Sequence, residues 1–256
     1  MNDPGLMTWQ PAQGQAQQLM LLLHGAGEQA ASMLPLAQRL QGEFAQAVLL
    51  APDGFEACER PKAGQSRPSP VGIEQSGKAT FAQDGGAGRQ WFSMRGLTDD
   101  NRAQRVAEVL PRLADWVRAA QAWSGVGPAA TALVGFSQGA ILALELVALH
   151  DGIAGRVLAF AGRYAQLPAQ APQHTTLHLF HGADDSVIPV SQARAAIGHL
   201  AALKGDATID IAAGIGHELA PTLVSSALHR LRSHIPHRTW AAALGAVPEL
   251  ARRSPA

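Results

Sequence analysis

Short apolar runs recur along the chain, and each run ends in a polar or glycine-containing turn. Most of the runs are continuous rather than alternating, which is typical of strands buried on both faces of a parallel sheet. The runs cover residues 19–24, 47–52, 131–136, 156–161, 176–181 and 208–213. We therefore expect these segments to form the strands of one buried sheet.

Stretches with helical periodicity separate the apolar runs. Residues 99–120 place apolar side chains at three-to-four spacing after Thr98, a good helix N-cap. Residues 138–149 are apolar almost all round, so a buried helix is expected there. Two further helices are expected at 191–203 and 220–234. This alternation predicts an α/β fold whose mostly parallel, doubly wound sheet carries helices on both faces.

Two regions depart from this alternation. Residues 54–90 contain several prolines and a glycine-rich end, which predicts a long loop or insertion. Residues 238–256 are expected to form a short helix and a loose tail. A chain of 256 residues is long enough for a full core, and one α/β domain of this size is common. We therefore expect a single domain over residues 1–256.

Charge and cysteine content exclude several classes of protein. Lys and Arg together number 20, as do Asp and Glu, so the chain lacks the basic surplus that nucleic-acid binding requires. Cys58 is the one cysteine, so no intrachain disulfide is possible. No secretory signal or apolar run of about 20 residues is evident. We expect a cytoplasmic protein with no membrane span.

The turn after the first apolar run has two interpretations. Gly25, Gly27 and Ala30 fit the pattern G-x-G-x-x-A, which can hold the pyrophosphate of a dinucleotide at a helix N-terminus. Asp53, at the end of the second apolar run, stands where a ribose-binding carboxylate is expected. In esterases, however, the corresponding turn supplies a backbone N–H to an oxyanion. Pro35, which follows soon after, would interrupt a helix that began at this turn.

A second glycine motif favours the esterase interpretation. Gly135-Phe136-Ser137-Gln138-Gly139 matches G-x-S-x-G and lies between a predicted strand and a predicted helix. A sharp turn in that position lifts a serine hydroxyl above the edge of the sheet, and the glycines allow the close backbone approach. The helix that follows directs its N–H groups toward the serine. This context predicts that Ser137 is a nucleophile.

A serine nucleophile needs a base and an acid that orients it. Asp184 and Asp185 follow the predicted strand 176–181, and His217 follows the last predicted strand. Their order along the chain after the serine, acid and then histidine, is that of α/β-hydrolases. The residues alone leave open which aspartate is the acid. His24 and His181 each end a strand before a glycine, and we expect them to fix loops.

Several motifs together resemble one known family. They read LLLHGAGE, GRQWFSMRGLTDDNR, GFSQGAILALE, HGADDSVIP and GIGHEL, and they occur in that order along most of the chain. The sequence resembles the phospholipase/carboxylesterase family of α/β-hydrolases, which includes the acyl-protein thioesterases. It is most similar to a bacterial branch of small esterases. The resemblance implies the α/β-hydrolase fold and hydrolysis of an ester.

The resemblance also implies roles for particular residues. It implies that Ser137 is the nucleophile, His217 the base and Asp185, rather than its neighbour, the acid. It further implies that the backbone N–H groups of Ala26 and Gln138 form an oxyanion hole. No metal and no organic cofactor is expected.

Three apolar residues are candidates for contacts with the substrate. Trp91 and Phe92 match a family segment near the substrate entrance, although core packing is an equal alternative for them. A pocket lined by Trp91, Phe92 and Ile188 would favour small to medium acyl groups on a small-molecule or lipid-like ester. An acyl-protein thioesterase, a lysophospholipase and a non-catalytic binding protein with the same fold remain alternatives, as does a dinucleotide-binding protein.

Overall fold

The computed structural model describes residues 5–58, 88–239 and 242. Most of the expected insertion at 54–90 and most of the expected tail at 238–256 lie outside the described residues. The described flanks of the insertion pair with each other: β4 (Glu56–Ala57) and β5 (Arg89–Gln90) form a short antiparallel ribbon. Residues 237–239 and 242 are helical.

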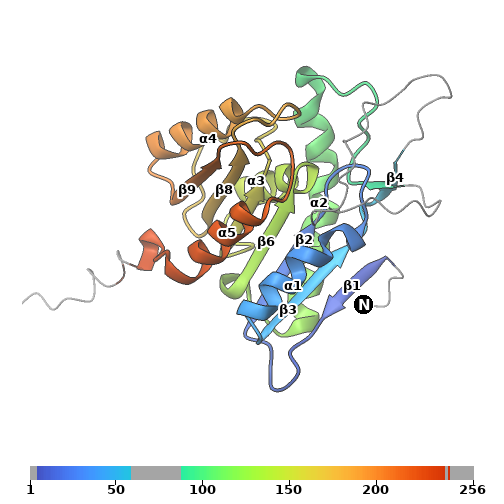
Figure 1. Ribbon diagram of the computed structural model, residues 1–256, viewed down its shortest axis with the longest axis vertical. Helices are drawn as coiled ribbons and strands as arrows, with labels where there is room; N and C mark the ends of the chain where they lie inside the picture. The colour runs from blue at the N-terminus through green and yellow to red at the C-terminus, as the bar shows by residue number, and fades with distance from the viewer. Residues whose placement is uncertain (1–4, 59–87, 240–241, 243–256) are drawn as a thin grey trace, which may run out of the picture.

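In the described part of the chain, seven strands form one sheet in the order β1-β3-β2-β6-β7-β8-β9 (Figure 1). The six strands predicted from the apolar runs are present within one residue of the expected bounds, and they pair in parallel. The α/β class and the mostly parallel sheet are therefore confirmed. The six strands are β2 (Gln18–Leu23), β3 (Ala47–Pro52), β6 (Thr131–Phe136), β7 (Arg156–Phe160), β8 (Thr176–Gly182) and β9 (Ala207–Ala212).

The seventh strand, β1 (Leu6–Trp9), was not predicted. It pairs antiparallel with β3 at one edge of the sheet. β1 has four residues and none of them is fully buried, so it lacks the continuous apolar run that marks the other strands.

Within the residues that the structure describes, the α-helices α1 to α5 include the four that the periodicity predicted. The fifth, α1, was not predicted. Pro35 does not interrupt it but lies in its first turn, where a backbone N–H would have no partner inside the helix. The helices are α1 (Leu34–Glu43), α2 (Asp99–Ser124), α3 (Gln138–Leu149), α4 (Val190–Ala202) and α5 (Pro221–Ser233), with 3₁₀ turns at η1 (Ala30–Met33) and η2 (Pro128–Ala130).

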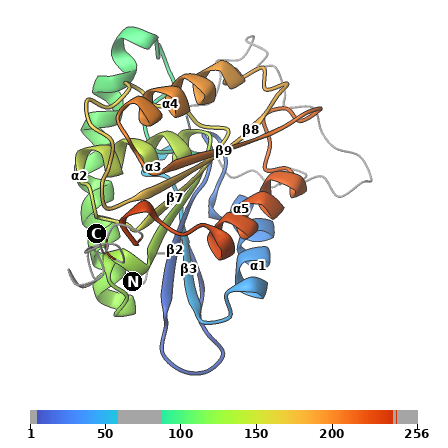
Figure 2. The same ribbon diagram turned by 90° about the vertical axis from the view of Figure 1, so that its left-hand side faces the viewer.

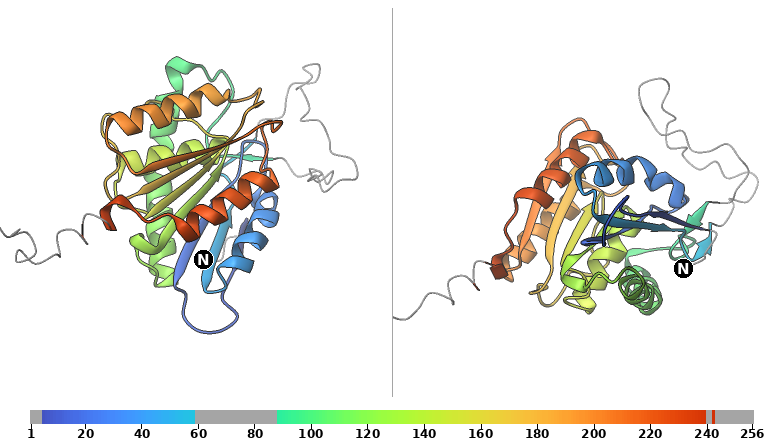
Figure 3. Two further views of the ribbon diagram at one scale, coloured as in Figure 1. Left: turned by 60° about the vertical axis from the view of Figure 1, so that its left-hand side comes forward. Right: turned by 90° about the horizontal axis from the view of Figure 1, so that it is seen from below.

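The helices cover both faces of the sheet. α2, α3 and α4 lie on one face, and α1 and α5 lie on the other (Figures 2 and 3). Successive side chains of β2 enter opposite layers: Leu19, Leu21 and Leu23 pack with α2 and α3, whereas Met20 and Leu22 pack with α1 and α5. Because both faces are buried, a central strand such as β2 is apolar at every position from Leu19 to Leu23.

The parallel strands bring distant loops to one edge of the sheet. The segments that follow β2, β6, β8 and β9 all leave from the carboxyl ends of their strands, the edge at which open α/β sheets bind ligands. Within the described residues, no helix is both long and apolar enough to cross a membrane.

Candidate active site

Ser137 occupies a sharp turn between β6 and α3. Its backbone angles are φ 52° and ψ −113°, a conformation that side-chain-bearing residues rarely adopt and that costs about 1–3 kcal/mol. The turn requires both flanking glycines. A Cβ on Gly135 would collide with the backbone of Gly139, and one on Gly139 would collide with the backbone of Leu23. The strained turn presents the Ser137 hydroxyl at the sheet edge.

Three side chains from three loops form a hydrogen-bonded series at that edge. His217 Nε2 lies 2.9 Å from Ser137 Oγ, and His217 Nδ1 lies 2.7 Å from Asp185 Oδ2. Nδ1 therefore carries a proton toward the carboxylate, and Nε2 accepts the serine proton. The ring of Phe136 packs against the imidazole with centroids 5.1 Å apart. The structure thus brings together Ser137, Asp185 and His217, the three residues that the sequence predicted as nucleophile, acid and base.

The Asp185 carboxylate is fixed by its own loop. Its side chain is fully buried, and Oδ1 accepts hydrogen bonds of 2.8 Å from the backbone N–H groups of Val187 and Ile188. His181 Nε2 bonds to the Ile188 carbonyl at 2.8 Å and lies 3.3 Å from Asp185 Oδ2. Asp184 is exposed to solvent. The geometry therefore places Asp185 against the imidazole, and His181 fixes this loop as expected.

Most backbone N–H groups of the loop after β2 already donate hydrogen bonds to other protein groups. The Gly25 N–H donates to Glu28 Oε2 at 2.9 Å, the Gly27 N–H to the Arg89 carbonyl at 2.8 Å, and the Glu28 N–H to the Gly25 carbonyl at 3.3 Å. The Ala26 N–H donates to no acceptor among the residues that the structure describes. Ala26 is thus the one position in residues 25–28 whose N–H is left for a ligand.

His24 holds the start of this loop, which the sequence also predicted. Its Nδ1 lies 2.7 Å from the Gly25 carbonyl, and its Nε2 accepts the Gly54 N–H at 2.8 Å. Burial lowers the pKa of His24, and only a neutral ring with its proton on Nδ1 satisfies both bonds. His24 therefore has a structural role beside the candidate triad.

The Gln138 side chain connects the start of α3 to the segment after β5. Its Oε1 accepts the Trp91 N–H at 2.8 Å, and its Nε2 donates to the Phe92 carbonyl at 2.8 Å and approaches Met94 Sδ at 3.5 Å. The Trp91 indole N–H donates to the His24 carbonyl at 2.9 Å. The sequence had assigned only the backbone of Gln138 a role, because residues so far apart give no local signal.

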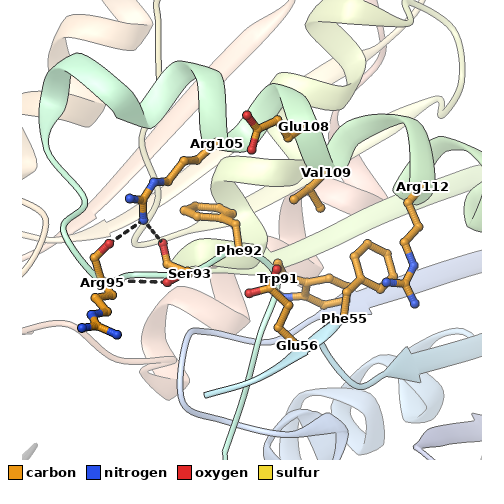
Figure 4. A pocket seen from close by; sticks show the side chains of 10 residues that line it. All are labelled: Phe55, Glu56, Trp91, Phe92, Ser93, Arg95, Arg105, Glu108, Val109 and Arg112. Atoms are coloured by element: carbon orange, nitrogen blue, oxygen red, sulfur yellow. Dashed lines mark hydrogen bonds between the residues drawn. The ribbon is translucent and has the colours of Figure 1, made fainter. Parts of the chain in front are cut away.

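The three predicted substrate contacts do not form one pocket wall. Trp91 and Phe92, both almost fully buried, line a cavity of about 410 Å³ beside α2 (Figure 4). Ile188 is not among its lining residues and lies instead on the Asp185 loop. The Arg112 guanidinium lies 4.0 Å from the centre of the Phe55 ring in this cavity. The burial of Trp91 and Phe92 gives weight to the packing alternative.

The geometry does not support a dinucleotide at the loop after β2. The Ala30 N–H, at the start of η1, already donates to Asp53 Oδ1 at 2.8 Å. The Ala30 N–H, which a pyrophosphate would need, is therefore already bonded to Asp53. The Asp53 carboxylate would also repel the phosphates. The helix that begins there is a 3₁₀ turn of four residues. Among the described residues, no group of His, Cys, Asp and Glu side chains could hold a metal ion.

Comparison with known proteins agrees with this architecture. Residues 69–235 match the sequence profile of a family described as Phospholipase/Carboxylesterase. The chain is 40% identical over 229 residues to the esterase YpfH of Escherichia coli strain K12, an alignment that covers 90% of this chain and 88% of that protein.

Solved structures give the same picture of the fold. The crystal structure of esterase PE8 superposes with a TM-score of 0.71 at 26% identity, covering 90% of this chain and 98% of the other. A carboxylesterase from Mesorhizobium loti superposes with a TM-score of 0.64 at 20% identity, covering 86% and 90% of the two chains. The likeness to PE8 and the family match together confirm the predicted α/β-hydrolase fold.

Proposed function

The chain belongs to the phospholipase/carboxylesterase family and is a carboxylesterase, and we propose that its reaction runs through Ser137, His217 and Asp185. The observation that carries this proposal is the unbroken series from Ser137 Oγ to His217 Nε2, 2.9 Å, and from His217 Nδ1 to Asp185 Oδ2, 2.7 Å. Nucleophile, base and orienting acid need this arrangement.

In the proposed reaction, His217 removes the hydroxyl proton as Ser137 Oγ attacks the ester carbonyl. The tetrahedral intermediate collapses, and the departing alcohol takes the proton from His217. Water, deprotonated by His217, then attacks the acyl-enzyme and releases the acid and the free serine. Asp185 keeps the imidazole in the required tautomer and stabilises its protonated form throughout.

The developing oxyanion is met by the N–H groups of Ala26 and Gln138 in this proposal. Ala26 is supported because its N–H bonds to no described residue while its neighbours are all engaged. Gln138 is supported because it is the first residue of α3, whose N-terminal N–H groups have no partners within the helix. Loss of one such donor typically costs about 3–4 kcal/mol of transition-state stabilisation.

We propose esters of small to medium acyl groups as substrates, with Trp91, Phe92 and Ile188 near the acyl chain. The cavity beside α2 supports contacts from the first two, and the position of Ile188 next to Asp185 supports the third. Hydrolysis of protein thioesters or of lysophospholipids by the same triad is the alternative within this chemistry.

Labelling with a fluorophosphonate probe tests the proposed nucleophile. The wild-type chain should be labelled, and the Ser137→Ala variant should not. Equal labelling of both would assign the nucleophile elsewhere, and failure to label a folded wild-type chain would favour a non-catalytic binding protein.

A series of p-nitrophenyl esters tests the proposed substrate range. kcat/KM should be highest for acyl chains of two to about eight carbons and should fall for longer chains. A maximum at palmitate would overturn the assignment and favour a lysophospholipase or an acyl-protein thioesterase.

A further inference from the structure

A glutamate side chain lies inside the loop that we assign to the oxyanion. We call residues 24–28 the oxyanion loop. The partly buried Glu28 carboxyl group accepts the Gly25 N–H through Oε2 at 2.9 Å, while the Glu28 N–H bonds to the Gly25 carbonyl at 3.3 Å. These two bonds close a tight turn around the Ala26 peptide. No step of the proposed reaction uses this carboxyl group.

The turn is also held from its other side. The Gly27 N–H donates to the Arg89 carbonyl at 2.8 Å, and the Arg89 N–H donates to the Glu28 carbonyl at 2.7 Å. Ala26 therefore lies between two held residues: Gly25, bonded to the Glu28 carboxyl group and to His24 Nδ1, and Gly27, bonded to the Arg89 backbone. With the Glu28 side chain removed, the Gly25 N–H would lose its acceptor, while the Gly25 carbonyl would keep its bonds to His24 Nδ1 at 2.7 Å and to the backbone N–H of residue 28 at 3.3 Å.

We propose that Glu28 is a positioning residue, whose side chain fixes the His24–Gly25 peptide and with it the backbone direction at Gly25, so that the Ala26 N–H points at the developing oxyanion. This inference rests on the proposed function. It assigns Glu28 a requirement in the transition state rather than in substrate binding, because the oxyanion exists only after attack on the carbonyl.

This positioning role does not require a negative charge on Glu28. Burial raises the pKa of the Glu28 carboxyl group, which favours its neutral form. A neutral carboxyl group still offers a carbonyl oxygen to the Gly25 N–H, and it avoids repulsion with the oxyanion. A glutamine should therefore replace Glu28 in this role, because its amide oxygen is a similar acceptor at a similar distance from the backbone.

The test compares Glu28→Ala with Glu28→Gln on one p-nitrophenyl ester. Glu28→Ala should lower kcat by about 10- to 100-fold and change KM by less than 2-fold, because a misdirected donor affects the transition state alone. Glu28→Gln should retain at least a third of the wild-type kcat. The affinity of Glu28→Ala for a trifluoromethyl ketone, which forms a tetrahedral adduct with the serine, should fall in proportion to kcat/KM.

Glu145→Ala is the matched control. Glu145 is also a partly buried carboxyl group that accepts backbone N–H groups, from Ala165 at 2.6 Å and Gln166 at 3.1 Å, but it lies on α3 away from the oxyanion loop. Its loss should lower the unfolding temperature while the folded enzyme keeps its ketone affinity. If Glu28→Ala lowers only the unfolding temperature, as this control does, Glu28 has no positioning role.

Ser137→Ala separates the two proposals. Retained hydrolysis in Ser137→Ala would overturn the proposed function itself. Hydrolysis that is lost in Ser137→Ala and unchanged in Glu28→Ala would overturn the Glu28 inference alone. If Glu28→Ala does not fold, Glu28→Gln decides: a kcat below one tenth of wild type with normal folding shows that the acceptor role assigned here is wrong.

Discussion

The two ends of the central sheet each hold a histidine bonded to a buried aspartate. At the carboxyl ends of the strands, His217 Nδ1 lies 2.7 Å from Asp185 Oδ2. At the amino ends, His234 Nε2 lies 2.9 Å from Asp206 Oδ1, just before β9 begins. By distance and burial alone, the two pairs are nearly equivalent.

Several groups around the amino-end pair form hydrogen bonds with one another. Asp206 also accepts the Thr176 hydroxyl at 2.7 Å and the His237 N–H at 3.1 Å. Nearby, the two ring nitrogens of His178 meet Thr208 Oγ1 at 2.8 Å and an Arg156 Nη1 at 3.1 Å. This network fastens the chain after α5 to the starts of the strands.

The comparison shows what distinguishes a candidate catalytic centre from a structural pair. At the carboxyl ends, the second nitrogen of the imidazole faces a hydroxyl held on a strained turn, and a backbone N–H nearby has no partner among the described residues. At the amino ends, by contrast, the Thr176 hydroxyl donates to the Asp206 carboxylate itself rather than to an imidazole. A histidine–aspartate pair is therefore a candidate for catalysis only when its neighbours include a suitable nucleophile and oxyanion donors.

The sharpest test of this difference is the removal of the hydroxyl. Ser137→Ala should lower kcat by about 10⁴- to 10⁶-fold, because the reaction then loses its nucleophile. Steady-state hydrolysis of a p-nitrophenyl ester measures the effect, and circular dichroism verifies the fold. Residual activity above one per cent of wild type would contradict the assignment.

Asp185→Asn should have the next largest effect, a loss of about 10³- to 10⁴-fold in kcat, because an amide no longer holds the required imidazole tautomer. The matched control is Asp184→Asn, which changes an exposed neighbour and should alter kcat by less than 3-fold. The opposite ranking would show that the wrong carboxylate had been assigned.

The amino-end pair should respond in stability instead. Asp206→Ala removes the side-chain acceptor of three hydrogen bonds, from Thr176, His234 and His237, and should lower the free energy of unfolding by about 3 kcal/mol, as measured in urea. The kcat of the folded enzyme should stay within 2-fold of wild type. A large fall in kcat with unchanged stability would contradict the division between the two ends.

The smallest expected effect is a pH dependence from His178. Burial and the Arg156 charge lower the pKa of His178 to about 3, from an ordinary value near 6.5. Between these values the unfolded chain binds more protons than the folded one, so stability falls as the pH falls. The contribution is about 2 kcal/mol between pH 6.5 and pH 5. His178→Gln should flatten that part of the urea-unfolding profile, and an unchanged slope would contradict it.

The sequence predicted the fold wherever burial leaves a continuous pattern. The six parallel strands were recognisable because helices cover both of their faces, as in β6, which is buried at every position. β1 was missed because an edge strand of four residues carries no such run. α2 was predicted to end at residue 120 but extends to Ser124, where Gly125 adopts φ 72° and ends the helix. That glycine was the available signal.

The site was predictable only in part from the sequence. Motif context indicated Ser137, and chain order indicated His217, because each follows a strand at the same sheet edge. The residues alone could not choose between Asp184 and Asp185, because the direction of each side chain depends on the turn after β8. The contacts of Glu28 and of the Gln138 side chain were missed. The LLLHGAGE motif contained Glu28 but did not reveal its bond to Gly25.

The backbone angles of Ser137 have a consequence for resistance to heat. A φ of 52° suits a glycine far better than any residue with a Cβ, so the fold is less stable with serine here than it could be. Ser137→Gly should therefore give an inactive protein that melts at a higher temperature than the active one. Substitutions that raise the melting temperature of the active enzyme have to lie elsewhere in this chain, because the proposed reaction needs the strained serine at position 137.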